Sequence, residues 1–158
     1  AFEDCSSLTS VTIPENVTGI SYRTFEKCSS LTSITIPDSV KEIGSSAFSH
    51  CSSLHTVNIG NGVTHIGDWA FACCDLLENI TIPDSITYIG YAVFAGCESL
   101  TNLTPNKNKY NDFWELLKLN NNKPIHTDCF TGCKALNDPI IYDALVDFNH
   151  GWARKEED

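Results

Sequence analysis

The chain has 158 residues, an apolar fraction of 42% and a formal net charge of −10 from 20 acidic and 10 basic side chains. One domain is the default at this length, and the acidic excess argues against nucleic acid as a partner and against charge-driven adhesion to anionic lipid. Because no apolar run approaches the ~18 residues of a membrane helix, we also expect no membrane insertion.

A repeat of 23 residues organises residues 1–103. Its marker is a phenylalanine at one fixed position, found at Phe2, Phe25, Phe48, Phe71 and Phe94. A fixed period of about 20–29 residues is typical of a leucine-rich solenoid, in which a single unit is too small to bury its apolar side chains and therefore stacks on its neighbours. The sequence thus predicts coils that stack in register.

Each unit contains two extended pieces and a turn. In the stretch 31–37, "LTSITIP", β-branched residues alternate with polar ones, which predicts a strand with Ile34 and Ile36 facing the core and Pro37 at its end. A second, shorter extended piece is "VKEI", residues 40–43, and "SSAFSHC", residues 45–51, is predicted to form one helical or 3₁₀ turn. Stacking then predicts an all-parallel sheet from residues near 11–13, 34–36, 57–59 and 80–82.

Six of the eight cysteines share one inward position of the repeat, namely Cys5, Cys28, Cys51, Cys74, Cys97 and Cys133. Free cysteine behaves as a small apolar side chain, and ligands spaced along a column do not converge on one zinc ion. We therefore expect an unpaired ladder in the core, with no disulfides and no metal site. Cys73 and Cys129 lie outside this column.

The pattern "LTSITIPDSVKEIGSSAFSHCSSL", residues 31–54, resembles the BspA-type, or Treponema-type, leucine-rich repeat, and the match is strict over residues 1–103. The resemblance implies an α/β repeat fold: a right-handed solenoid with a parallel sheet on its concave side and short helical or 3₁₀ turns. It also implies a role in binding, often on microbial surfaces, with a protein, host matrix or cell-surface protein as the partner.

The repeat pattern fails after Leu103, because Pro105 stands where an isoleucine is expected. We interpret 104–124 as an insertion with a short helix near 111–119, in which Tyr110, Phe113, Trp114 and Leu117 follow helical spacing. Two interpretations of Phe113 and Trp114 stay open: the rings pack on the flank of the solenoid, or one of them is an exposed anchor for a partner.

The pattern resumes with Phe130 and Cys133, so 125–158 is interpreted as a degenerate last repeat, a C-terminal capping helix and a polar tail. Asp138 and Pro139 have the residue types expected at the start of that helix. The first coil starts mid-unit without a cap, so we expect a monomer or weak self-association through this coil.

Small polar side chains occupy the outward positions of the predicted long strands. The candidate binding residues are Thr12, Thr35, His55, Asn58, Glu78, Asn79 and Thr81. This face is either a solvated surface of Thr and Ser ladders or a flat platform for a protein or glycan. It lacks the Tyr, Trp and Arg side chains that dominate the energetics of many interfaces.

No phosphate-binding glycine loop, G-x-S-x-G or H-E-x-x-H motif is present, so we expect no enzyme activity and no cofactor. The favoured function is a non-catalytic, adhesion-type interaction module at the cell surface or secreted. The alternatives are targeting repeats of a larger enzyme or toxin, and an intracellular scaffold. The chain has no methionine and no signal peptide, so we expect it to be a fragment of a longer microbial protein.

Overall fold

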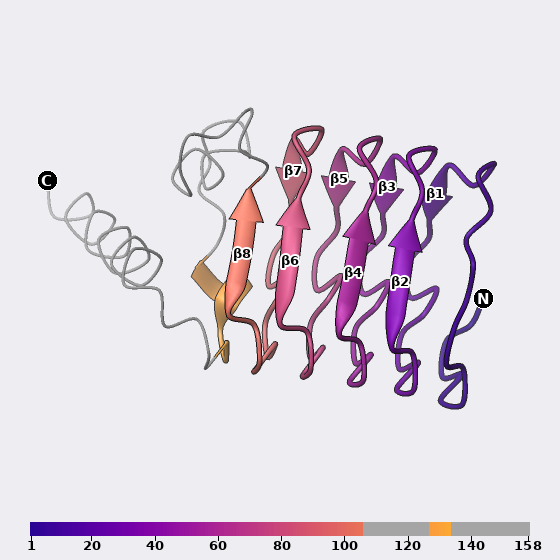
Figure 1. The fold of residues 1–158 in the computed structure, drawn as a ribbon. Coiled ribbons are helices and arrows are strands. Elements are labelled where there is room, and N and C mark those ends of the chain that lie inside the picture. The colour runs from indigo at the N-terminus through magenta and orange to yellow at the C-terminus, as the bar shows by residue number, and fades with distance from the viewer. Residues whose placement is uncertain (106–126, 134–158) are drawn as a thin grey trace, which may run out of the picture.

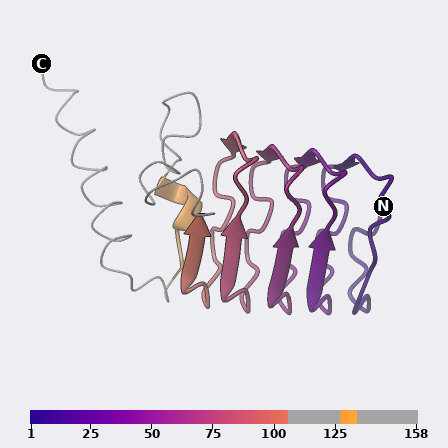
Figure 2. The same ribbon diagram turned by 45° about the horizontal axis from the view of Figure 1, so that its top comes forward.

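The computed structural model describes residues 1–105 and 127–133, whose coils stack in a row and form two parallel sheets (Figure 1). The long-strand sheet has the order β2-β4-β6-β8, with bounds Ser33–Ile36, Thr56–Ile59, Asn79–Ile82 and Asn102–Pro105. The short-strand sheet has the order β1-β3-β5-β7, with bounds Gly19–Ile20, Glu42–Ile43, His65–Ile66 and Tyr88–Ile89. In Figure 2 the short strands form a row of their own above the long strands.

Every strand pair is parallel and joins equivalent residues of neighbouring repeats, as in Ile34↔Val57 and Ile43↔Ile66. The predicted parallel sheet and the second extended piece are therefore confirmed for these coils. Strand β8 runs to Pro105, which pairs with Ile82, so the sheet continues two residues past Leu103. A proline is tolerated at this end of the sheet because its missing N–H is not needed by a further strand.

The first coil differs from the prediction, because residues near 11–13 do not join the sheet. Thr32 N donates to Thr9 O at 3.3 Å and Lys41 N donates to Thr18 O at 2.9 Å, but between these two bonds no backbone hydrogen bond connects the described first coil to β2. The same coil does pair on its other side, where β1 joins β3, so the gap is confined to the long-strand side of the first coil. Strand β2 is consequently the edge of the long-strand sheet.

The predicted helical turn at residues 45–51 does not form; the segment is a run of turns. Ala47 N and Ser49 N each donate to the carbonyl three residues earlier at 3.2 Å. In contrast, the N–H groups of Ser46, Phe48 and His50 donate at 2.8 Å to carbonyls of the next coil. A helical turn keeps its hydrogen bonds within the segment, so bonding to the next coil has replaced it.

We call the four segments 21–28, 44–51, 67–74 and 90–97 the turn face. Along each segment the backbone amides donate alternately within the segment and to the next coil. This alternation is accompanied by left-handed backbone conformations at two repeat positions, and the residues at each position form a column along the solenoid. The first column is Arg23, Ser46, Trp69 and Ala92, and the second is Asp4, Lys27, His50, Cys73, Gly96 and Gly132, with φ between 51° and 83°. Only the last two of these are glycine, the residue that adopts this conformation without steric cost.

A continuous stack of phenylalanine rings runs through the core. Adjacent rings from Phe2 to Phe130 have centroids 5.2–6.0 Å apart and planes within 12° of parallel. Phe130 lies at the end of the 3₁₀ helix η1, Thr127–Phe130, and packs on Phe94. Phe130 thus extends the stack of phenylalanine rings by one member. The predicted insertion helix with Phe113 and Trp114, and the predicted capping helix, lie outside the described residues.

All eight cysteines are free thiols, as predicted. Cys28, Cys51, Cys74, Cys97 and Cys133 each donate a hydrogen bond of 3.1–3.3 Å to the carbonyl of the phenylalanine in the preceding coil. Burial raises the pKa of Cys51 to about 12, and the neighbouring Cys28 thiol adds to the rise. Cys5 is exposed instead of buried, because it lies on the first coil, whereas Cys129 is buried although it lies outside the column.

Candidate binding surfaces

The outward residues of the long-strand sheet form a polar face whose side chains bond along the solenoid axis. Asn102 Nδ2 donates to Asn79 Oδ1 at 2.7 Å, and Asn58 Nδ2 lies 3.5 Å from Thr35 Oγ1. His55 and Glu78 precede β4 and β6 at one repeat position, and both are exposed, as is Thr81 on β6. The structure thus places the polar candidates of β2, β4 and β6 on one surface, where amides and hydroxyls already satisfy part of one another's hydrogen bonding.

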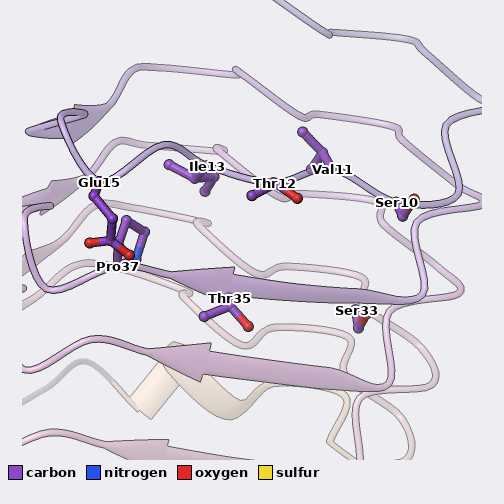
Figure 3. Close-up of a pocket in the computed structure, with 8 residues that line it drawn as sticks. All are labelled: Ser10, Val11, Thr12, Ile13, Glu15, Ser33, Thr35 and Pro37. Carbon is purple, nitrogen blue, oxygen red and sulfur yellow. The ribbon is translucent and has the colours of Figure 1, made fainter.

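A groove of about 310 Å³ separates the first coil from strand β2 (Figure 3). Its lining includes two candidate residues, Thr12 on the unpaired first coil and Thr35 on β2. The other lining residues are Ser10, Val11, Ile13, Glu15, Ser33 and Pro37. The groove is therefore a mixed polar and apolar trough beside a sheet edge, a place where extended backbone can pair with backbone.

A second surface gathers aromatic side chains at the corner between the short-strand sheet and the turn face. The His65 and Tyr88 rings stack at 5.7 Å with planes 25° apart, and the Trp69 and Tyr91 rings meet edge to face at 5.3 Å. Trp69 is 45% exposed, Tyr88 41% and Tyr91 37%. We call His65, Trp69, Tyr88 and Tyr91 the aromatic corner.

Local structure explains why these rings point outward. His65 and Tyr88 begin β5 and β7, whose second residues, Ile66 and Ile89, face the core. The chain then turns at Gly90, where a Cβ would lie 2.5 Å from Asp68 Oδ1, so the turn is too tight for a side chain. The sequence indicates that Trp69, Tyr88 and Tyr91 lie outside the inward columns but does not bring their rings together; the available signal was the repeat position that His65 and Tyr88 share.

Carboxylates flank the aromatic corner. Asp68 Oδ1 accepts a hydrogen bond of 2.8 Å from Tyr91 N, and Glu42 on β3 is in register with His65. Residues 52–105 contain no lysine or arginine. Within the part of the chain that the structure describes, the three ion pairs lie on the first two coils: Arg23–Glu26 at 3.0 Å, Arg23–Glu3 at 3.6 Å and Lys27–Asp4 at 3.6 Å.

Two other kinds of site are absent from residues 1–105 and 127–133. These residues bring together no group of three metal-ligating side chains, and they include no helix with the length and apolarity to cross a membrane.

The sequence model of the BspA type leucine-rich repeat region matches residues 1–111 in six copies. The chain belongs to the BspA-type leucine-rich repeat family. In the structure described above, each internal repeat supplies one strand to each sheet and one segment to the turn face. A comparison with curated proteins finds no match.

Solved structures of bacterial proteins resemble this BspA-type solenoid. A leucine-rich cell surface protein from Faecalibacterium prausnitzii is 33% identical, with a TM-score of 0.51, 66% of this chain covered and 35% of that chain. A leucine-rich repeat protein from Bacteroides capillosus is 34% identical, with a TM-score of 0.50 and coverages of 63% and 73%. The pneumococcal vaccine antigen PcpA is 27% identical, with a TM-score of 0.52 and coverages of 59% and 23%. The chain thus spans about a third of the F. prausnitzii protein's length.

Proposed function

We propose that this BspA-type solenoid is a non-catalytic module that binds a protein partner at a cell surface, as part of a longer surface or secreted protein. The observation that carries the proposal is the aromatic corner, where Trp69, Tyr88 and Tyr91 remain 37–45% exposed. Tyr and Trp side chains are enriched at protein interfaces and contribute much of the binding energy there, because they bury a large area at a small entropic cost.

The similar structures support the location. One is described as a leucine-rich cell surface protein and another as a pneumococcal vaccine antigen. A core occupied by stacked phenylalanine, isoleucine and cysteine side chains supports a structural role for the interior. Recognition would then belong to the outward faces, as is general for solenoids.

Glycan binding is a second candidate, and the polar face favours it. Asn79 and Asn102 present a row of amides on a flat sheet, bonded to each other at 2.7 Å. Planar amides of this kind are suited to the hydroxyl groups of a sugar, since each offers both a donor and an acceptor.

Both candidates are tested by labelling the 158-residue chain with a fluorophore and measuring its binding to cultured epithelial cells and to bacterial cells by flow cytometry. Saturable binding that disappears after the target cells are treated with protease, and persists after glycosidase treatment, is expected for a protein partner. The opposite sensitivity would identify a glycan. Binding that does not saturate on any cell type would contradict both candidates.

A further inference from the structure

The turn that follows strand β4 differs in sequence from its counterparts in the neighbouring coils. It reads Gly60-Asn61-Gly62, whereas the equivalent triplet is Pro37-Asp38-Ser39 one coil earlier and Pro83-Asp84-Ser85 one coil later. Asn61 is exposed and Gly62 is partly buried. This pair is the only asparagine followed directly by glycine in the 158-residue sequence.

An asparagine followed by glycine can react with its own backbone. The backbone nitrogen of the next residue attacks the side-chain amide carbon and closes a five-membered succinimide ring. A side chain on that next residue crowds the nitrogen and restricts the backbone, whereas glycine does neither. The other asparagines of residues 1–105 are followed by bulky apolar residues, namely Val17, Ile59, Ile80 and Leu103. Asn61 is therefore the one asparagine of this region with an unhindered nitrogen after it.

The two groups that would react are free of hydrogen bonds in the folded protein. Among the described residues, neither the backbone N–H of Gly62 nor the side-chain amide of Asn61 has a hydrogen-bond partner. The amides on either side are bonded, since Asn61 N donates to Asp38 Oδ1 at 2.6 Å and Val63 N donates to Gly60 O at 3.2 Å. Ring closure at Asn61 thus breaks no hydrogen bond of the fold.

A lysine lies beside the reacting pair. Lys41 Nζ is 3.1 Å from the position that a Cβ on Gly62 would take, so the ammonium group is next to this glycine. A nearby cation favours the deprotonated form of an N–H group and stabilises the negative charge that develops on the attacked amide oxygen. The surroundings of Gly62 therefore promote attack by its nitrogen.

From this geometry we propose that Asn61 is a self-modifying site, at which the folded chain deamidates to aspartate and isoaspartate with promotion by the Lys41 ammonium. Gly62 N loses its proton and bonds to Asn61 Cγ; the Cγ–Nδ2 bond breaks, and the departing nitrogen takes up a proton and leaves as ammonia. Water then opens the succinimide. Opening at Cγ gives aspartate, and opening at the backbone carbonyl carbon gives isoaspartate. No oxidant or other co-reactant is needed.

The modification changes both the charge and the backbone of the turn. Either product adds one negative charge to the net charge of −10, at the repeat position that Asp38 occupies one coil earlier. Isoaspartate also lengthens the backbone by one carbon where space is short, because even a Cβ on Gly62 would overlap Asp38 O. The inference is independent of the binding function proposed above.

The test follows the reduced 158-residue chain at pH 8.0 and 37 °C, with a synthetic peptide of residues 56–67 incubated in parallel. Peptide mapping by mass spectrometry locates the gain of about 1 Da that replacement of the amide by a carboxyl group produces. A protein isoaspartyl methyltransferase detects the isoaspartate product. Asn61 in the folded chain should react within about threefold of the rate in the peptide, because no hydrogen bond protects it.

Variants separate the chemistry from the fold. Asn61→Gln should abolish the modification at this position, since its ring would need six members. Lys41→Gln should slow it about threefold, and Lys41→Arg, which keeps the charge, should restore the parent's rate. Lys27→Gln is the matched control, because Lys27 pairs with Asp4 on the turn face, and it should react like the parent. All four should keep the far-ultraviolet circular dichroism spectrum of the parent.

Three outcomes would overturn the proposal. An unmodified Asn61 in the folded chain, under conditions where the peptide reacts, would show that the fold protects the turn. Deamidation confined to the asparagines of residues 106–158 would place the reactive site elsewhere. An unchanged rate in Lys41→Gln would contradict promotion by the ammonium group.

Discussion

Raising the pH should unfold this protein through its buried thiols, and Cys51 allows the effect to be measured. The Cys51 side chain is fully buried, and burial raises its pKa from 9.0 to about 12. Between these values the unfolded chain loses the thiol proton while the folded chain keeps it. The contribution of the protonated Cys51 thiol to the free energy of unfolding is therefore fully present below pH 9 and is lost as the pH rises toward 12.

The magnitude follows from the shift. One pKa unit corresponds to about 1.4 kcal/mol, so at pH 10.5 the ionisation of Cys51 costs about 2 kcal/mol of unfolding free energy. Burial also raises the pKa of Cys129, likewise fully buried, to about 12, which doubles the loss to about 4 kcal/mol. Since small domains are stable by about 5–15 kcal/mol, this loss is a large fraction of the total.

The assay is urea unfolding, followed by circular dichroism under nitrogen with a reductant, at pH 8.0, 9.5 and 10.5. The comparison is between the parent chain and Cys51→Ala, which removes one titrating thiol. From pH 8.0 to pH 10.5 the parent should lose about 2 kcal/mol more than the variant, because the variant lacks the Cys51 contribution. Equal losses in the two proteins would refute the view that this thiol stays protonated in the folded core.

Three further predictions concern packing and edges. Phe48→Ala should lower the free energy of unfolding in urea by about 3–5 kcal/mol, because its ring is fully buried between two others. Phe2→Ala, at a side chain that is 42% exposed, should lower it by under about 1 kcal/mol. Equal losses would contradict the stacked core. Gly44→Ala should lower the melting temperature and reduce the free energy of unfolding by about 1–3 kcal/mol, since the added Cβ would lie 2.7 Å from a backbone nitrogen. Gly19→Ala is the control and should leave stability nearly unchanged, because the atom nearest to its added Cβ is 3.8 Å away. Amide hydrogen exchange should be faster in the edge strand β2 than in the internal strand β6, and equal protection would show that the first coil pairs with β2 in solution.

Much of the fold could be predicted because one number, the 23-residue period, determines which residues stack. The columns of Phe48, Cys51 and Ile34 follow from it directly, since equivalent residues of successive coils must be neighbours. The turn face could not be predicted in the same way. An inward Phe48 and an inward Cys51 fit either a helical turn or a run of turns, and the choice depends on hydrogen bonds to the next coil, which the segment itself does not reveal.

The binding surfaces were harder to predict than the core. The polar candidates around Asn79 were placed correctly on one face, because outward positions of a strand alternate with inward ones. Trp69, Tyr88 and Tyr91 could be placed outside the inward columns, but the contact between Trp69 and Tyr91 could not be predicted, because they are 22 residues apart and occupy different repeat positions. Their contact depends on how the chain turns the corner at Gly67 and Gly90, and the period does not specify that turn.

Because the left-handed residues of the turn face recur in every internal coil, the conformational strain of this solenoid grows in proportion to the number of coils. Most internal coils hold two non-glycine residues in this conformation, such as Ser46 and His50, at a cost of about 1 kcal/mol each. The cost recurs with every added coil, so an array of five such coils stores about 10 kcal/mol, comparable to the net stability of a whole domain. Tandem arrays built from a coil with glycine or asparagine at these two positions would therefore become more stable with each copy, and chain length would serve as a direct control of melting temperature.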